Sequence, residues 1–338
     1  MVLRLVAAGL AIGVVLDCSS ASAETQLKMS SQWTENTATS EADRWWAAEL
    51  DKRSAGKLKV KIFYAGALAK ANENLQLIRS GGVELVNMSA SYFGADLPLF
   101  TAPNSIPMAM AEVPQTTTLI QRMMAEVPAL DEEAKRNGVK ALFFHHLNPY
   151  QLVCKEPVKG LADLKGKKIR TWGSDMPKMV QAAGGVPVTL GLAELYEGLS
   201  RGTVDCIPFS VDLVVNYKIF EVAKHIHDVT LWLGPTSGVW MSRAAWDKLT
   251  PDKQKVILEV SGEAAIKDRD LTLAAAKSAV DQLKAAGVTF HAFPEADKNA
   301  WKSANPDFFA EFIAAQEKSG RGDAAKSMVK IWKEVVGG

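Results

Sequence analysis

The sequence predicts an α/β fold of two lobes, with a hinge between them and one long helix that connects both lobes. Short apolar strands alternate with amphipathic helices along most of the chain, which is typical of parallel crossovers. Pro-containing turns interrupt this alternation at Asn148-Pro149 and Gly234-Pro235, and each interruption indicates a crossing between lobes. The chain has 338 residues, of which 48% are hydrophobic, so it can bury two cores.

The first 23 residues have the three parts of a secretory signal peptide. Arg4 precedes an apolar run over 5–16, and the small residues 21–23 form a cleavage signal. The apolar run is too short to anchor the chain in a membrane. Lipidation of Cys18 is the alternative, although Asp17 is a poor fit for the small residue that lipidation needs. We therefore expect an exported, periplasmic protein.

The first lobe is expected to comprise residues 24–147 and about 235–265. After an apolar strand over 27–31, the residues Ala42, Trp45, Trp46 and Leu50 share one face of a helix. The segment 57–62 alternates lysines with apolar residues, which predicts a half-buried strand. Further along, we expect a helix over 72–79, a strand over 83–88, a turn over 89–93, a helix over about 112–136 and a strand that ends near Leu147.

The second lobe is expected to comprise residues 148–234 and part of 266–338. Its central stretch, 161–222, reads as an apolar strand ending near Arg170, a helix, a second strand and helix, and a third strand. Thr250-Pro251 predicts the N-cap and first residue of a helix that runs to about 286. Such a helix is long enough to bridge both lobes.

Two cysteines, Cys154 and Cys206, follow the signal peptide, and both lie in predicted strands of the second lobe. In an oxidising compartment they can form a disulfide. The alternative is a pair of buried thiols, and the sequence favours the thiols.

The composition and motifs exclude several functions. The net charge is only +1 and the basic residues are spread along the chain, which is not the pattern of a nucleic-acid-binding protein. The sequence contains no HExxH, GxSxG or Walker A motif, so we expect neither an enzyme nor a bound cofactor. A metal site is not expected either. His145 and His146 should point to opposite faces of a strand, and the pair His225 and His227 has no third ligand in view.

The segment Asp131, Glu132 and Glu133 is interpreted as a solvated helix surface rather than as a pair of catalytic carboxylates.

Arg170 is the first candidate for a ligand site. A guanidinium at the end of a strand binds a carboxylate with two parallel hydrogen bonds, and ligands of α/β sheets bind at the carboxyl ends of strands. Several aromatic residues also lie at or just after predicted strand ends. Each alone is more often part of a core, but together they predict an apolar wall of the cleft: Trp33, Tyr92, Phe93, Tyr150, Trp172, Phe209 and Trp240.

Six segments, in order, resemble the periplasmic solute-binding proteins of TRAP (tripartite ATP-independent periplasmic) transporters, the DctP-like family. The resemblance extends from about Leu27 to Gln316, and it is carried by DRWWAAELDKRSAGKLKVKIFYAGAL, LPLFTAPNSIPM, LADLKGKKIRTWGS, GGVPVTLGLAELYEGLSRGTVD, IFEVAKHI and AWDKLTPDKQKVILE. It implies a periplasmic binding protein fold that closes around an organic acid and delivers it to small and large membrane subunits driven by an ion gradient. It also implies that Arg170, which matches the arginine of the family's LKGxKIR segment, clamps the ligand carboxylate. A monomer is expected.

Two departures from the family pattern concern the ligand. In VDCIPFS, Phe209 stands where the family often has an asparagine and Cys206 replaces a glycine; near Tyr150 and Gln151 an arginine is absent. A second buried carboxylate without a cation is costly, so a dicarboxylate is disfavoured unless Lys155 or a residue of the other lobe reaches it.

The expected ligand is a hydrophobic or aromatic monocarboxylate, with 2-oxo and 2-hydroxy acids included. C4-dicarboxylates and sugar acids remain alternatives within the family. Outside it, the alternatives are an exported α/β enzyme acting on organic acids, the binding protein of an ATP-driven uptake system and a sensory accessory protein. The expected ligand-binding residues are Arg170, Trp172, Phe209, Ser210, Trp33, Gln32, Ser91, Tyr92, Tyr150 and Trp240, with Gln32, Ser91 and Ser210 available for an additional oxygen.

Overall fold

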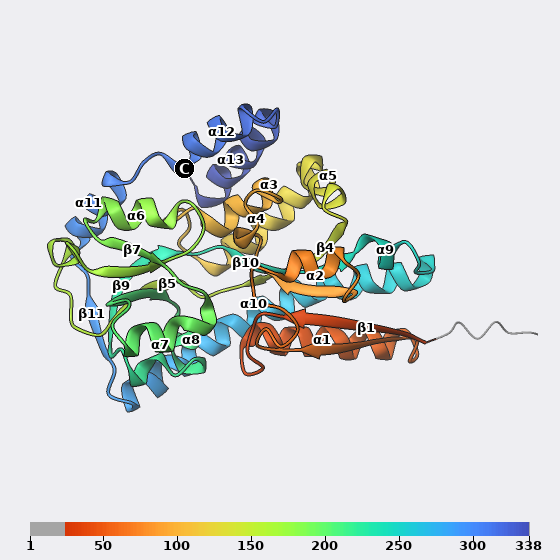
Figure 1. Ribbon diagram of the computed structural model, residues 1–338, viewed down its shortest axis with the longest axis horizontal. Coiled ribbons are helices and arrows are strands. Elements are labelled where there is room, and N and C mark those ends of the chain that lie inside the picture. Colours follow the sequence, from red (N-terminus) through yellow and green to blue (C-terminus); the bar gives the residue numbers. More distant parts are fainter. Residues whose placement is uncertain (1–23, 338) are drawn as a thin grey trace, which may run out of the picture.

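The computed structural model describes residues 24–337, which form two lobes, each built around one β-sheet (Figure 1). The predicted two-lobed α/β fold with a long connecting helix is confirmed. The expected signal peptide and the alternative of lipidation at Cys18 lie outside the described residues. Within the described part of the chain, no helix is both long enough and apolar enough to cross a membrane.

Lobe 1 contains a five-stranded sheet with the order β2-β1-β3-β10-β4. β1 is parallel to both of its neighbours, whereas β10 is antiparallel to both of its own. Leu27 and Met29 of β1 pack with Trp46 and Leu50, which lie on the predicted apolar face of the first helix. The strands are β1 (Thr25–Ser31), β2 (Leu58–Phe63), β3 (Leu85–Met88), β4 (Val139–His146) and β10 (Pro235–Ser242); the helices are α1 (Ala38–Arg53), α2 (Asn74–Arg79), α3 (Pro98–Ser105), α4 (Val113–Glu126), α5 (Pro128–Arg136) and α9 (Arg243–Trp246).

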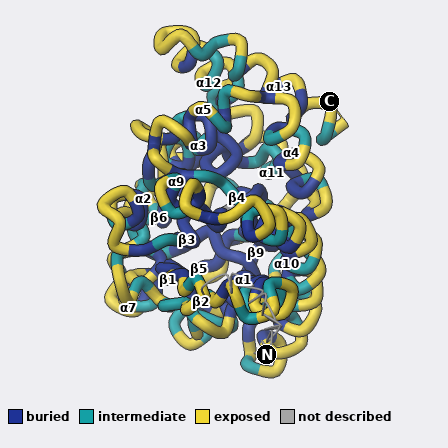
Figure 2. Tube along the Cα trace, turned by 90° about the vertical axis from the view of Figure 1, so that its right-hand side faces the viewer, coloured by how far each residue is buried: buried dark blue, intermediate teal, exposed yellow. Residues whose placement is uncertain are grey.

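Lobe 2 contains a six-stranded sheet with the order β11-β9-β5-β8-β6-β7. β6 is parallel to β7 and β8, and β5 is antiparallel to β8 and β9. Figure 2 shows that β3 of lobe 1 and β5 and β9 of lobe 2 are buried in the interior. The strands are β5 (Tyr150–Cys154), β6 (Lys168–Thr171), β7 (Val186–Thr189), β8 (Cys206–Phe209), β9 (His225–Trp232) and β11 (Thr289–Ala292); the helices are α6 (Met176–Ala182), α7 (Leu195–Ser200), α8 (Val211–Asn216) and α11 (Glu295–Ala304).

Three segments connect the lobes. The chain leaves the sheet of lobe 1 between β4 and β5, over residues 147–149, and returns between β9 and β10, over 233–234. Helix α10 (Pro251–Ala285) then packs on α1 and β4 of lobe 1 and on α8 of lobe 2. In Figure 1 it passes behind both lobes. The helices α12 (Phe308–Glu317) and α13 (Gly322–Val336) pack on each other, and α13 returns to α4 of lobe 1.

Two expectations about the segment 112–136 were wrong. The single expected helix is two helices, because Pro128 lacks an N–H group and begins a new helix after Val127. Glu133 does not lie on a solvated surface. It is fully buried, and its carboxylate accepts hydrogen bonds from the main-chain N–H groups of Leu99 (3.0 Å) and Phe100 (3.1 Å) in the first turn of α3. A helix start carries unpaired N–H groups, and Glu133 satisfies them from a distant part of the sequence.

Cys154 and Cys206 form a disulfide, the alternative that the sequence favoured less. They are directly opposite each other in the antiparallel pair of β5 and β8, with their Cα atoms 4.1 Å apart. The register of β5 and β8 brings the two cysteines together, and this register depends on residues far apart in the sequence. The spacing of the cysteines in the sequence does not predict the disulfide.

Candidate functional site

A small cavity lies between the two lobes and is lined by residues of both. It brings together seven of the ten residues expected to bind the ligand: Gln32, Trp33, Ser91 and Tyr92 of lobe 1, and Tyr150, Arg170 and Trp172 of lobe 2. Four further residues line it, namely Ser89, Asn104, Leu192 and Trp232.

The strands place most of these residues. β1, β3 and β6 are followed directly by lining residues, as expected for the carboxyl ends of strands in an α/β sheet. Gln32 and Trp33 follow β1, and Ser89 begins the turn after β3. Gln32 and Trp33 of lobe 1 thus line the same cavity as Trp172 of lobe 2, which lies more than a hundred residues later in the chain.

Arg170 lies on the lobe 2 side of the cavity and is only 2% exposed. Its Nε donates a hydrogen bond to the carbonyl oxygen of Leu190 (3.2 Å), and its guanidinium carbon lies 4.4 Å from the centre of the Trp172 ring. Burial lowers the pKa of Arg170, and the nearby tyrosine hydroxyls, with that of Tyr92 first, oppose this shift. A guanidinium remains charged at neutral pH despite such a shift, because its ordinary pKa is above 12.

The buried charge of Arg170 has no anionic partner in the cavity. Among the described residues that line the cavity, none is an aspartate or a glutamate, and Arg170 is the one charged side chain. A buried charge without a counter-charge is unfavourable, so an anion placed beside Arg170 would be stabilised.

The lobe 2 wall is aromatic. The rings of Tyr150, Trp172 and Trp232 contact one another edge to face, with centroid distances of 5.3–5.9 Å. Burial raises the pKa of Tyr150 well above its ordinary value, so its hydroxyl stays neutral. This wall offers flat apolar surface next to one cation.

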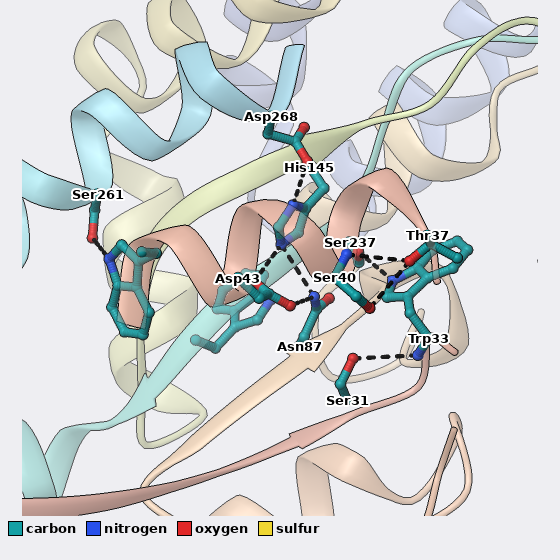
Figure 3. A network of polar contacts seen from close by, with 12 residues as sticks. Ser31, Trp33, Thr37, Ser40, Asp43, Asn87, His145, Ser237, Ser261 and Asp268 are labelled. Atoms are coloured by element: carbon teal, nitrogen blue, oxygen red, sulfur yellow. Dashed lines mark hydrogen bonds and ion pairs between the residues drawn. The ribbon is translucent and has the colours of Figure 1, made fainter. Parts of the chain in front are cut away.

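The lobe 1 wall is polar. The hydroxyl of Ser89 donates a hydrogen bond to Oδ1 of Asn104 (2.8 Å) and lies 2.9 Å from the hydroxyl of Ser91. The carbonyl oxygen of the Gln32 side chain accepts a hydrogen bond from the main-chain N–H of Ser89 (3.4 Å). Trp33 is fixed by a bond from its Nε1 to the hydroxyl of Ser237 (2.9 Å), which Figure 3 shows.

Direct contacts hold the lobes together beside the cavity. Nε1 of Trp172 donates a hydrogen bond to the main-chain carbonyl of Asn104 (3.1 Å), and the hydroxyl of Ser105 donates to Oδ2 of Asp175 (3.1 Å). Gly173, between them, has a φ of +60°, and a Cβ at this position would lie 3.2 Å from Cβ of Ser105. We call Asn104, Ser105 and the segment 172–175 the interlobe latch. The two lobes are therefore in direct contact beside the cavity.

Three expected ligand residues do not line the cavity. Phe209 is fully buried beneath it, against the rings of Tyr150 and Tyr217, and Ser210 is the buried N-cap residue of α8. Trp240 packs against Phe100 and Phe144 in the core of lobe 1. β10 is antiparallel to β3, so its carboxyl end lies at the opposite edge of the sheet from the cavity. Phe93 is likewise in this core rather than in the cleft wall.

Some lining residues were not predicted from the sequence. Trp232 could have been predicted, since it ends an apolar strand just before the break at Gly234. For Asn104 the sequence gives a weaker indication, which is its place in the family-like segment 97–108. Leu192 follows β7, and no sequence pattern distinguishes it from the other leucines.

A buried polar network joins the hinge to α10 (Figure 3). Nδ1 of His145 lies 2.8 Å from Oδ1 of Asp268 in α10, and Nε2 of His145 lies 3.1 Å from Oδ1 of Asp43 in α1. Burial opposes the charge of His145, but the two carboxylates outweigh it and raise its pKa to about 10. Burial likewise opposes the charge of Asp268, but His145 and His146 outweigh it and lower its pKa to about 2.

His145 and His146 were expected to point to opposite faces of a strand, yet both rings contact Asp268. Nδ1 of His146 lies 2.8 Å from Oδ2 of Asp268, whose other oxygen contacts His145. His146 is the last residue of β4, where the chain leaves the sheet, so strand alternation no longer separates the two rings. The next polar residue, Asn148, donates hydrogen bonds to Asp212 of lobe 2 (2.9 Å) and to the carbonyl of Thr272 in α10 (2.8 Å).

Residues 29–316 match the family model of the bacterial extracellular solute-binding proteins, family 7 (DctP). The chain is 27% identical over 258 residues to the 2,3-diketo-L-gulonate-binding periplasmic protein YiaO of Escherichia coli (strain K12), and the match covers 75% of this chain and 76% of YiaO.

Solved structures share the fold. A TRAP periplasmic solute-binding protein from Desulfovibrio salexigens with bound orotic acid has a TM-score of 0.83 at 21% identity, covering 92% of this chain and 99% of that one. The corresponding protein from Sulfitobacter sp. NAS-14.1, with bound β-D-galacturonate, has a TM-score of 0.80 at 21% identity, covering 92% and 100%. DctP7 of Bordetella pertussis, which binds pyroglutamic acid, has a TM-score of 0.81 at 21% identity, covering 91% and 99%.

The family model spans most of the chain, and the two-lobed fold of the solved structures agrees with it. The chain therefore belongs to family 7 of the bacterial extracellular solute-binding proteins, the DctP family of TRAP transporter solute-binding proteins.

Proposed function

We propose that this protein captures an organic acid in the cavity between its lobes and delivers it to the membrane subunits of a TRAP transporter. The observation that carries the proposal is Arg170, a buried cation in the cavity wall without an acidic partner among the lining residues that the structure describes. Proteins of similar structure have bound orotic acid, galacturonate and pyroglutamic acid, and each of these is an organic acid.

The cavity favours a small acid with one carboxylate. Arg170 is the one cation that lines it in the described part of the chain, and Lys155 is not among the lining residues, so a second carboxylate would be buried without a counter-charge. The rings of Tyr150, Trp172 and Trp232 favour a ligand with a flat apolar or aromatic body.

We propose that capture occurs in two steps. The carboxylate first binds the guanidinium of Arg170 on lobe 2, and lobe 1 then covers it with the residues that follow β1 and β3. Closure removes water from around the ion pair and strengthens it, because the local dielectric falls. The acid stabilises the closed form by binding it more tightly than the open form, and the membrane subunits recognise the closed form.

Sugar acids are the second candidate, and the lobe 1 wall supports them. Gln32, Ser89, Ser91 and Asn104 present amide and hydroxyl groups to the cavity, which match the hydroxyls of a sugar acid. The similar Sulfitobacter protein has bound β-D-galacturonate, and YiaO is named for 2,3-diketo-L-gulonate.

A thermal-shift screen of aromatic monocarboxylates, sugar acids and C4-dicarboxylates, followed by calorimetry, tests the proposal, because ligands of the folded state raise the melting temperature. Arg170→Ala should weaken binding of the best acid by about 100-fold or more, and Arg170→Lys should restore only part of it, since lysine lacks the planar fork. Arg201→Ala removes an exposed arginine and serves as the control. Unchanged affinity in Arg170→Ala would rule out the anchor. Recovery of the acid unaltered after incubation argues against the enzyme alternative.

A further inference from the structure

Trp232 has a buried hydrogen-bond donor without a partner. The residue ends β9, lines the cavity and is 2% exposed. Within residues 24–337, no acceptor lies within hydrogen-bonding distance of its Nε1. A buried N–H group that lacks an acceptor is unfavourable, and native structures contain few of them.

Elsewhere the chain supplies an acceptor for buried indole groups. Nε1 of six other tryptophans donates a hydrogen bond of 2.9–3.4 Å to a protein oxygen: Trp33, Trp46, Trp172, Trp240, Trp301 and Trp332. Trp33 and Trp172 are also cavity residues, and their N–H groups are occupied. Among the three lining tryptophans that the structure describes, Trp232 is therefore the one whose indole N–H has no protein acceptor.

The ring of Trp232 is held in place on two sides. It packs edge to face against Tyr150, with centroids 5.3 Å apart, and against Trp172, with centroids 5.9 Å apart. Tyr150 is also its register partner between β5 and β9. A donor fixed by its neighbours binds an acceptor without losing much conformational freedom.

We infer that Nε1 of Trp232 donates a hydrogen bond to a neutral oxygen on the body of the bound acid, and that this residue sets specificity. The inference rests on the proposed function, in which Arg170 takes the carboxylate. An indole nitrogen donates and does not accept, so it selects an oxygen acceptor rather than an ammonium group. A second carboxylate is disfavoured at this position because Arg170 is the one cation among the lining residues that the structure describes. The protein should therefore prefer oxo- and hydroxy-monocarboxylic acids to the same acids without that oxygen.

Matched pairs of acids test the inference by calorimetry. The probes are phenylpyruvate against 3-phenylpropanoate, and 4-hydroxybenzoate against benzoate. The wild type should bind the oxygen-bearing acid of at least one pair more tightly. Trp232→Phe should weaken binding of the oxygen-bearing acid by about tenfold, since a neutral hydrogen bond contributes roughly this factor to affinity. It should weaken binding of the matched acid without that oxygen by less than about twofold. Trp240→Phe removes a buried indole N–H outside the cavity and should leave both affinities unchanged.

Equal losses for both acids of a pair in Trp232→Phe would overturn the inference and leave the proposed function standing. A second variant is used if Trp232→Phe does not fold. In it Trp232 is replaced by 3-benzothienylalanine, which has sulfur in place of the N–H group and nearly the same shape. This replacement should also weaken binding of the oxygen-bearing acid about tenfold, and retained affinity would count against the inference. If no acid of the wider screen binds the wild type, the proposed function fails and this inference fails with it.

Discussion

The indole Nε1 of Trp172 donates a hydrogen bond to the main-chain carbonyl of Asn104, 3.1 Å away, and thereby joins lobe 2 to lobe 1. The face of the same ring carries the guanidinium of Arg170, at 4.4 Å. One side chain thus contacts both the proposed carboxylate anchor and the opposite lobe. Binding at Arg170 and closure of the lobes are therefore expected to be coupled through Trp172.

Trp172→Phe keeps an aromatic face under Arg170 but removes the bond to Asn104. We expect the variant to bind every acid that the wild type binds about two- to tenfold more weakly, with a similar factor for each acid, because a neutral hydrogen bond of the closed form is lost. Calorimetry with two chemically different acids measures this factor. Trp301→Phe removes an equivalent bond within lobe 2, to the carbonyl of Met179, and should leave affinity unchanged. A loss confined to one acid would show that Trp172 acts through ligand contact alone.

Gly173→Val should prevent full closure. The added Cβ would lie 3.2 Å from Cβ of Ser105 in the other lobe, and a branched side chain needs more room than this. We expect a larger radius of gyration in X-ray scattering with saturating acid, together with weaker binding. Gly166→Val is the matched control, since Gly166 also has a positive φ, +76°, but no neighbouring atom within 4 Å of the added Cβ. Compact scattering from Gly173→Val would contradict the role of the interlobe latch.

His145→Gln should lower the free energy of unfolding at pH 7 by about 3–5 kcal/mol, because it removes the cation that lies between the buried carboxylates of Asp43 and Asp268 and leaves Asp268 with His146 alone. The pKa of His145 is raised to about 10, so its contribution is complete below about pH 6.5 and is lost as the pH rises through 10. Urea denaturation across this range should show the wild type losing its advantage over the variant at high pH. Asp131→Asn, an exposed carboxylate, should show no such trend. A constant difference from pH 6 to 10 would mean that His145 is neutral in the folded protein.

The pKa of Asp268 is lowered to about 2, so its contribution is present above about pH 3.8 and is lost as the pH falls through 2. Acid unfolding curves of the wild type and His145→Gln should therefore differ below pH 4, since the variant lacks the larger of the two histidine contributions that lower this pKa. Coincident curves in acid would indicate that the two groups do not interact.

Removal of the disulfide should affect stability but not recognition. The double variant Cys154→Ser, Cys206→Ser should lose about 2–5 kcal/mol of unfolding free energy, as is usual when a native disulfide is removed. Neither cysteine lines the cavity, so calorimetry should give an affinity within about twofold of the wild type. Reduction of the wild type should have the same effect on urea denaturation. A large loss of affinity would mean that the cross-link positions Tyr150, which lies on the same strand as Cys154.

Much of the fold was predictable, because local periodicity and turn residues determine it. The helix that begins at Pro251 and the crossings near Pro149 and Pro235 are set by proline and by apolar spacing, and both signals are present in short windows of sequence. The burial of Glu133 and the Cys154–Cys206 disulfide depend instead on how distant segments pack. Neither feature can be predicted from the residues next to it in the sequence.

The cavity likewise contains some residues that local sequence patterns predict and others that they do not. Arg170, Trp172, Gln32 and Trp33 were expected in the cleft because Arg170 lies near the carboxyl end of its strand and the other three directly follow strands. Trp240 was misplaced because the direction of β10 is a property of the sheet, which no local pattern reveals. Asn104 was missed because its role comes from contact with the opposite lobe.

The burial of Arg170 also bears on how quickly an acid can leave. A ligand on a side chain that is 2% exposed, with lobe 1 in contact with lobe 2 beside it, is expected to leave mainly when the lobes part. Its residence time is then governed by how often the lobes part, and acids of different affinity share this limit. A membrane partner that pulls the lobes apart would shorten that residence time without competing for any atom of the ligand.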